Sequence, residues 1–330
     1  MNDSLCCEIV RTPDGKLTMQ SPPPPVVSIG GNFFYSDENN SVINEELYKK
    51  NEEARKPLRD YLDQIIKMTE ASQKGDLVAG AMIDDWLGSW ADGNAMTKID
   101  SQQDGFERKW ILSGLLIAYW RNSPHTNWQK TQKIEKWLST LTHLMMEDYM
   151  EYKKSSQKNN HVYWAGLVAI EMSAINSDIN LMNWGLEKVR FGLSQIDAEG
   201  FLPLELDRKG RALQYHRVSI EALMMAAYFA KFQGIDLLSE NNSALNRLAL
   251  AILKGYADPE IFAAKTGVKQ EFKLKESTAW LAVYDTLRPG NKQVAQLLEE
   301  FPPIQNRALG GITKNVVGKS PTNSCKKAFR

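Results

Sequence analysis

From about residue 43 nearly the whole chain has the sequence pattern of helices, with apolar residues at intervals of three and four in residues 44–68, and this feature constrains the fold more than any other. The segments 44–68 and 77–93 are typical of amphipathic helices, and the second ends at Gly93, a suitable C-cap. We find no run with the alternating pattern of a strand. Further helices are predicted near residues 106–121, 127–154, 162–174, 178–195, 213–233, 242–255 and 275–286.

About ten helices joined by short turns indicate helical hairpins arranged side by side. Two arrangements remain open from periodicity alone: an open solenoid and an (α/α) barrel. No repeat of about 34 or 40 residues is present, which weakens the regular solenoid. We expect an extended N-terminal tail over residues 1–24, which ends in SPPPP, and a single domain over residues 25–330.

Charge and hydropathy exclude several classes of partner. Forty basic and forty acidic residues cancel, which disfavours nucleic-acid binding. No stretch approaches 18 uninterrupted apolar residues, so we expect no membrane partner. Nothing in the sequence speaks for oligomerisation, and a monomer is the default expectation. The opening residues MNDSLCCEIV do not have the pattern of a secretory signal peptide, although such a peptide could have been removed.

The three cysteines, Cys6, Cys7 and Cys325, all lie near the termini of the sequence. Two interpretations remain open. They are free thiols, or Cys325 pairs with one of the other two in an oxidising compartment. The motifs HExxH, CxxC, GxxxxGK[ST] and GxSxG are absent, and no histidines or acids have the spacing of metal ligands. We therefore expect no metal and no cofactor.

Two stretches concentrate polar and aromatic residues at the starts of predicted helices. In SSQKNNHVYWAG, residues 155–166, His161 is one of only four histidines in the chain. It is either a core residue beside a helix cap or part of an active site. In residues 197–223, four basic residues, a tyrosine and a histidine crowd together where a loop becomes a helix: Arg208, Lys209, Arg211, Tyr215, His216 and Arg217. Free backbone N–H groups there favour an anion, although a basic surface face remains the alternative.

The loop over residues 25–41 contains the aromatic sequence FFYSD and no helical period. Its aromatic side chains either anchor it to the domain or belong to a mobile lid that presents Phe33, Phe34 or Tyr35 to a ligand.

Several segments together resemble polysaccharide lyase family 5, the alginate (poly-β-D-mannuronate) lyases. They are PPPPVVS, FFYSD, RKWILSG, NNHVYWAG and GFLPLELDRKGRALQYH, and the likeness extends from about residue 22 to residue 312. The resemblance implies an all-α fold, an incomplete (α/α) barrel, or toroid, of helical hairpins with an aromatic lid loop. It also implies a metal-independent enzyme that is periplasmic or secreted and acts on an anionic polysaccharide.

The family motifs imply catalytic roles for four residues. Asn160 and His161 neutralise the carboxylate on C5 of a uronate, Arg208 activates a tyrosine, and Tyr215 takes the C5 proton and protonates the C4 oxygen. This β-elimination needs carboxylate neutralisation because charge develops in an enolate-like transition state. It also needs an activated tyrosine, whose ordinary pKa is about 10. Where the two groups lie on opposite sides of the ring, as in glucuronate, His161 is the candidate base.

The resemblance implies further residues that bind substrate, among them Arg211 and His216 from the basic cluster. The others are Tyr35, Tyr48, Arg55, Gln103, Trp110, Trp164 and Arg307. Trp164 either packs beneath the catalytic pair or stacks on a sugar.

Departures from the family pattern at Leu204, Gln214 and Arg217 leave room for a broad-specificity lyase that also acts on polyglucuronate or hyaluronate. An extra arginine beside the sugar cleft would suit such substrates. Two other classes remain. One is an (α/α)-barrel glycoside hydrolase that uses Glu205 and Asp207, and the other is a non-catalytic polysaccharide-binding protein.

Overall fold

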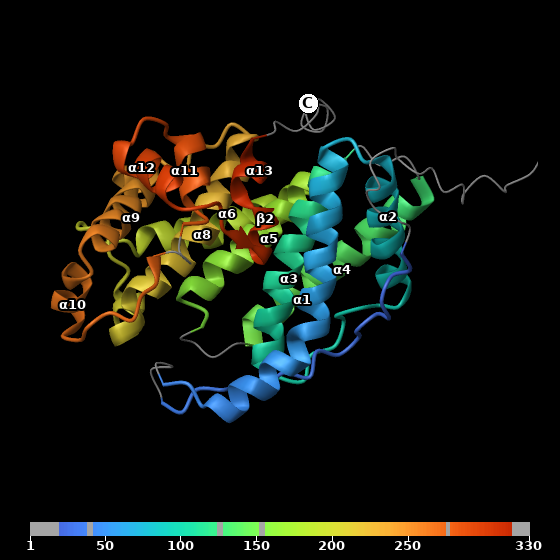
Figure 1. The fold of residues 1–330 in the computed structure, drawn as a ribbon, viewed down its shortest axis with the longest axis horizontal. Coiled ribbons are helices and arrows are strands. Elements are labelled where there is room, and N and C mark those ends of the chain that lie inside the picture. The colour runs from blue at the N-terminus through green and yellow to red at the C-terminus, as the bar shows by residue number, and fades with distance from the viewer. Residues whose placement is uncertain (1–19, 38–41, 124–127, 152–155, 275–277, 319–330) are drawn as a thin grey trace, which may run out of the picture.

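The computed structural model describes residues 20–37, 42–123, 128–151, 156–274 and 278–318. Most of its helices form pairs along the chain (Figure 1). They are α1 (Glu45–Gln73), α2 (Leu77–Asp92), α3 (Gln102–Arg121), α4 (Trp128–Glu151), α5 (Asn160–Asn176), α6 (Ile179–Ser194), α8 (Ala212–Lys231), α9 (Glu240–Ala257), α11 (Leu281–Leu287) and α12 (Lys292–Glu300).

The remaining elements connect these pairs. They are α7 (Pro203–Leu206), the 3-10 turn η1 (Lys209–Arg211), α10 (Glu260–Thr266), η3 (Arg307–Leu309) and α13 (Thr313–Val317). Two short strands, β1 (Gln305–Asn306) and β2 (Gly311–Ile312), pair in antiparallel fashion. In the part of the chain that the structure describes, no helix is long and apolar enough to cross a membrane.

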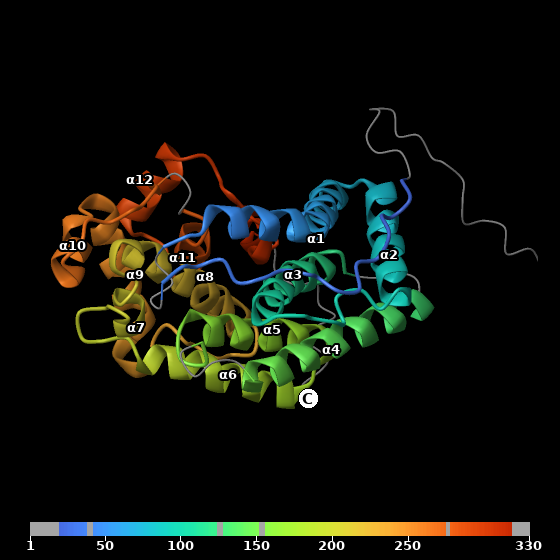
Figure 2. The same ribbon diagram turned by 90° about the horizontal axis from the view of Figure 1, so that it is seen from below.

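Consecutive hairpins stack into two rows. Helices α1, α3, α5, α8 and α11 contact one another in that order, and each packs on its partner α2, α4, α6, α9 or α12. Figures 1 and 2 show the hairpins following one another from α1 and α2 at one end to α11 and α12 at the other. This is the expected incomplete (α/α) barrel of helical hairpins.

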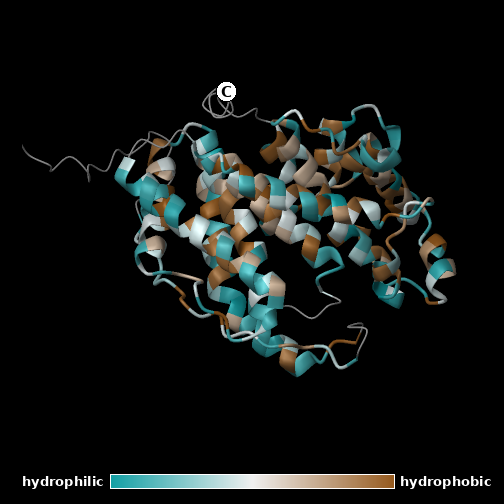
Figure 3. Ribbon diagram, turned by 180° about the vertical axis from the view of Figure 1, so that it is seen from behind, coloured by the Kyte–Doolittle hydropathy of each residue, from teal (hydrophilic) through white to brown (hydrophobic). Residues whose placement is uncertain are grey.

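Close packing between α5 and α6 depends on two glycines. A Cβ on Gly166 would lie 2.9 Å from the Gly185 carbonyl oxygen, and a Cβ on Gly185 would lie 2.7 Å from the Gly166 carbonyl oxygen. The two backbones therefore touch, and the helices can approach only because neither residue has a side chain. Figure 3 shows hydrophobic residues gathered in the middle of the helix stack, where one continuous core forms.

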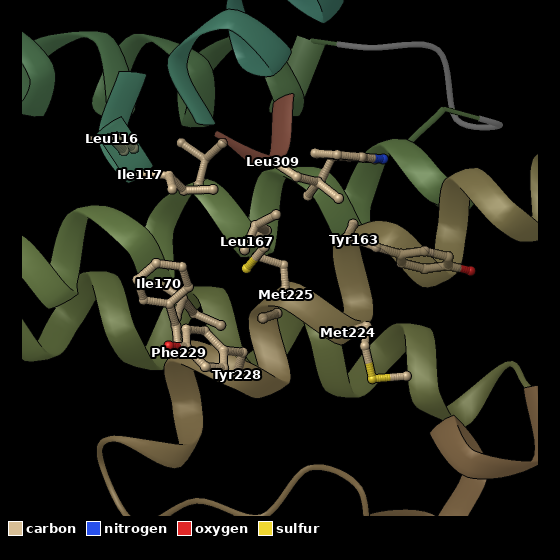
Figure 4. Packing of buried hydrophobic residues seen from close by; sticks show 14 of the residues in the cluster. Leu116, Ile117, Tyr163, Leu167, Ile170, Met224, Met225, Tyr228, Phe229 and Leu309 are labelled. Atoms are coloured by element: carbon tan, nitrogen blue, oxygen red, sulfur yellow. The ribbon is translucent and has the colours of Figure 1, made fainter. Parts of the chain in front are cut away.

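The C-terminal segment closes onto the first half of the chain. Leu309 joins the core formed by residues such as Ile117 of α3, Leu167 of α5 and Met225 of α8 (Figure 4). A Cβ on Gly114 would lie 2.3 Å from the Arg307 carbonyl oxygen, so η3 rests directly on the backbone of α3.

The described end of the expected N-terminal tail, residues 20–24, is held against α2. The indole nitrogens of Trp86 and Trp90 donate to the carbonyl oxygens of Gln20 and Pro23, at 2.9 and 3.0 Å. The predictions for Cys6, Cys7 and Cys325 fall outside the described residues.

Candidate active site

A cavity of about 600 Å³ opens where the aromatic loop meets the N-terminal ends of α3 and α5 and the segment from α7 to α8. It brings together most of the residues predicted from the sequence, although they are far apart in the chain. Those that line it are Tyr35, Arg55, Gln103, Trp110, Asn160, His161, Arg208, Arg211 and Tyr215.

The N-terminal end of α5 presents Asn160 and His161 to this cavity. Asn159 caps the helix by accepting a hydrogen bond from the His161 backbone N–H at 3.1 Å. Both the backbone N–H and the side-chain Nδ2 of Asn160 donate to Oε1 of Glu205, at 2.8 and 2.9 Å. The cap and Glu205 therefore fix the orientation of the two residues that face the cavity.

Glu205 is fully buried beneath the site. Burial raises its pKa above the ordinary value, although Arg208 and the donated hydrogen bonds of Asn160 oppose that shift. Its second oxygen lies 3.7 Å from Nε of Arg208. Because Glu205 does not line the cavity and already holds Asn160, it is not placed as one of two cleft carboxylates of a glycoside hydrolase.

His161 stacks on Phe106, with ring centroids 3.6 Å apart. Its Nδ1 lies 3.3 Å from Nζ of Lys109, and its carbonyl oxygen lies 3.2 Å from the same nitrogen. Burial, then Lys109 and Arg208, hold the pKa of His161 well below its ordinary value, so the imidazole is neutral. Sequence reasoning missed Phe106 and Lys109, although Lys109 belongs to the RKWILSG segment.

Tyr215 lies between two arginines and a second tyrosine. The guanidinium carbons of Arg208 and Arg211 lie 4.4 and 5.3 Å from the centroid of its ring. Its hydroxyl is 3.0 Å from that of Tyr35, which accepts a hydrogen bond from Nη1 of Arg211 at 3.1 Å. The predicted arginine effect is present, because both guanidinium groups lower the pKa of Tyr215, but burial outweighs them and raises it.

Gln214 and Arg217, which depart from the family pattern beside Tyr215, lie in different places. Gln214 lines the cavity and accepts a hydrogen bond from Nε of Arg211 at 3.1 Å, which orients that guanidinium. Arg217 points elsewhere and pairs with Glu221 on the next turn of α8 at 2.8 Å. The expectation of an extra arginine beside the cleft is therefore wrong for Arg217.

Four residues predicted to bind substrate do not line the cavity. The side chain of Tyr48 packs edge-on against Phe34, and the indole of Trp164 is buried and donates to the Val218 carbonyl oxygen at 3.0 Å. Trp164 thus packs beneath the site, one of its two predicted roles. Arg307 forms an ion pair with Asp63 at 2.6 Å.

His216 requires a correction. It is fully buried, its Nε2 accepts from the Leu202 backbone N–H at 2.9 Å, and its Nδ1 lies 2.8 Å from the Ala212 carbonyl oxygen. Both ring nitrogens are engaged, so His216 holds the turn before α7 and cannot contact a sugar.

The aromatic loop uses its rings in different ways. Phe34 is buried and packs under Arg55, whose guanidinium also pairs with Glu107 at 3.1 Å. Tyr35 reaches into the cavity to Tyr215. The loop therefore both anchors itself through Phe34 and presents Tyr35 to the site. Among the described residues, no group of three His, Cys, Asp or Glu side chains could hold a metal ion.

Comparisons with known proteins identify relatives of this chain. A family model described as alginate lyase matches residues 35–262. The alginate lyase of Pseudomonas fluorescens is 37% identical over 236 residues, which cover 68% of this chain and 63% of that protein. The alginate lyase of Cobetia marina is 35% identical over the same coverage. The match thus spans less than two thirds of the length of these relatives.

A longer match is found with the alginate lyase of Pseudomonas aeruginosa, 30% identical over 82% of this chain and 78% of that protein. Among solved structures, a variant of alginate lyase A1-III complexed with tetrasaccharide superposes with a TM-score of 0.81 at 20% identity, covering 92% of this chain and 87% of that chain. The structure of alginate lyase A1-III from Sphingomonas species A1 gives 0.77. These superpositions establish the fold.

Proposed function

We propose that this chain, which belongs to the alginate lyase family, cleaves 1,4-linked polyuronates by β-elimination, with poly-β-D-mannuronate as its preferred substrate. The observation that carries the proposal is the convergence of Asn160, His161 and Tyr215 on one cavity. Their side chains come from the starts of α5 and α8, and an anionic sugar bound there would touch both.

The start of α5 suits the substrate carboxylate. Backbone N–H groups at a helix N-terminus and the partial positive charge of the helix favour an anion. Asn160 uses one hydrogen of its amide for Glu205, which leaves the second for a ligand. Neutralising the carboxylate stabilises the negative charge that develops when the C5 proton leaves.

Tyr215 is the proposed base and acid. It acts as a phenolate: the ionised oxygen takes the C5 proton, the C5 electron pair forms the C4=C5 double bond, and the C4–O bond breaks as the resulting phenol gives that proton to the leaving oxygen, which restores the phenolate. Because Tyr35 accepts from Arg211, its own hydroxyl hydrogen can be donated to Tyr215 and stabilise the phenolate. The flanking guanidinium groups of Arg208 and Arg211 act in the same direction.

The test is a comparison of Tyr215→Phe with the unmodified chain. Ultraviolet absorbance of the unsaturated product is followed on polymannuronate, polyguluronate, polyglucuronate and hyaluronate. We expect kcat on polymannuronate to fall by about 10² to 10⁴, with KM little changed, because the variant loses the proton-transfer group but keeps the carboxylate site.

The matched control is Tyr228→Phe, a buried tyrosine of the same helix that lies outside the cavity and contacts the Val317 carbonyl oxygen. It should leave turnover unchanged. Equal turnover in Tyr215→Phe would contradict the mechanism, and saturated products with a new reducing end would indicate hydrolysis.

A further inference from the structure

Lys109 is a buried cation in direct contact with the imidazole of His161. It lies on α3, its side chain is fully buried, and its Nζ is 3.3 Å from Nδ1 and 3.2 Å from the carbonyl oxygen of His161. The same nitrogen sits over the rings of Phe106 and Trp110, at 5.0 and 5.7 Å from their centroids. Two aromatic faces, a ring nitrogen and a carbonyl oxygen therefore surround it.

The contact determines where the imidazole carries its proton. An ammonium group has three hydrogens and no lone pair, so Nδ1 of His161 must offer it a lone pair. Burial lowers the pKa of Lys109 well below its ordinary value, yet a neutral amine still has two hydrogens, one for Nδ1 and one for the carbonyl oxygen. As an ammonium, or as an amine that donates to both atoms, Lys109 keeps the hydrogen of the neutral imidazole on Nε2.

The other ring nitrogen, Nε2, is the one left for a ligand in the cavity. His161 lines the cavity, and within the described residues Nε2 makes no hydrogen bond. The stack on Phe106 holds the ring plane, and the contact with Lys109 determines which edge of the ring carries Nδ1.

We propose that Lys109 is a positioning residue that fixes the proton of His161 on Nε2, so that the imidazole meets the substrate as a hydrogen-bond donor and not as a base. A donor suits the neutralisation of a C5 carboxylate. To act as a base, His161 needs an unprotonated Nε2, so its hydrogen must be on Nδ1. Lys109 must then be neutral to accept a hydrogen bond from Nδ1.

This inference rests on the proposed function and extends it to specificity. Where the C5 hydrogen and the C4 oxygen lie on the same side of the ring, Tyr215 alone can serve both. Where they lie on opposite sides, His161 would have to act as the base, and Lys109 opposes that. The Lys109 contact therefore selects mannuronate over glucuronate.

The first experiment measures the tautomer without substrate. In protein labelled with ¹⁵N-histidine, long-range ¹H–¹⁵N correlations distinguish Nε2–H from Nδ1–H, and the chain has only four histidines. His161→Gln assigns the signal. We expect the Nε2–H pattern in the unmodified chain and a mixture in Lys109→Met. An Nδ1–H or imidazolium pattern in the unmodified chain at neutral pH would overturn the proposal, whether or not Lys109→Met folds.

The second experiment measures specificity as the ratio of kcat/KM on polymannuronate to that on polyglucuronate. We expect Lys109→Met to lower this ratio at least tenfold. Ser113→Ala, one turn further along α3 and also buried against α5, should leave it unchanged. An unchanged ratio in Lys109→Met would overturn the role in specificity. If the unmodified chain cleaves neither polymer, the proposed function fails while the tautomer measurement still decides the role of Lys109.

Discussion

Two buried carboxylates lie at opposite ends of α5, and their surroundings differ. Glu205 packs under the N-terminal end, where two N–H groups of Asn160 and the nearby Arg208 face it. Glu171 lies in the C-terminal half, where its hydrogen bond in the described structure is to Ser113 at 3.0 Å. Burial raises the pKa of both. The two carboxylates are therefore equally buried, but Glu205 supports the candidate site and Glu171 contributes only to packing.

The largest expected difference between the two ends is in catalysis. Glu205→Ala removes the acceptor that orients Asn160, so kcat should fall about 100-fold, the typical cost of losing one transition-state donor. Glu171→Ala, at equal burial, should leave kcat per folded molecule unchanged. Steady-state kinetics on polymannuronate check both, and equal losses in the two variants would remove the distinction between the ends.

The second comparison concerns helix packing, at one glycine of α6 and one glycine of α2. Gly185→Ala would place a Cβ 2.7 Å from the Gly166 carbonyl oxygen and 2.7 Å from Cγ1 of Ile170. Because backbone cannot yield cheaply, we expect a loss of about 1 to 3 kcal/mol in the free energy of unfolding, measured with urea. Gly88→Ala in α2, where a Cβ would meet nothing within 4 Å, is the control and should stabilise the protein. If both variants were destabilised, the helices would be intolerant of an added methyl group in general, and the contact between Gly166 and Gly185 would not be special.

The third comparison concerns the pH dependence of stability, to which Glu171 in the C-terminal half of α5 contributes. Ser113 has one hydroxyl hydrogen, and the carbonyl oxygen of Ala308 at 2.8 Å takes it, so Glu171 is best placed as a protonated donor to Ser113. In the unfolded chain this carboxyl ionises at about pH 4.3. Above that pH, and up to the raised folded-state pKa, the unfolded state binds fewer protons than the folded state. Stability is therefore lost as pH rises through this window, by up to about 1.4 kcal/mol per pH unit.

Glu171→Gln tests whether stability falls as pH rises, because the amide keeps the shape of the carboxyl group and cannot ionise. The unfolding free energy of the unmodified chain, relative to the variant, should decrease as pH increases from about 4.3. A difference that is flat with pH would mean that Glu171 ionises equally in the folded and unfolded states.

The smallest expected effects compare two helix caps. Asn159→Ala at α5 and Asp178→Ala at α6 each remove a side chain that accepts backbone N–H groups, and each should cost about 1 kcal/mol of stability. Only Asn159→Ala should also lower kcat, by several-fold, because it releases the backbone N–H of His161. Equal kinetics in the two variants would argue that the cap does not position the site.

The sequence predicted the long helices well, although α3 and α5 are buried on nearly all sides and have no one-sided apolar face. The predicted segment 77–93 corresponds to α2, and 162–174 lies inside α5. The short helices α10 and α12 were missed, since seven and nine residues are fewer than the roughly 11 to 18 over which a helical pattern is usually read. In the segment predicted as a helix over 275–286, α11 begins only at Leu281.

Within the site, sequence motifs identified residues but not their directions. Tyr215 and His216 are adjacent on α8, and adjacent helix residues point to different faces, so one lines the cavity while the other is buried. Lys109 could not be distinguished from a solvated lysine, because its environment is created by α5, some fifty residues later in the chain. Long-range convergence of this kind is not encoded in local spacing.

The closure of the C-terminal segment onto α3 has a consequence for synthesis of the protein. Ser113 and Ala308 are hydrogen-bonded across a separation of 195 residues. At roughly 5 to 20 residues per second, about 10 to 40 s pass between their emergence from a ribosome. During that interval the face of α3 around Gly114 has no η3 to cover it. The first hairpins must therefore remain soluble with an uncovered apolar face, and chaperone demand should be greatest for nascent chains that stop short of residue 307.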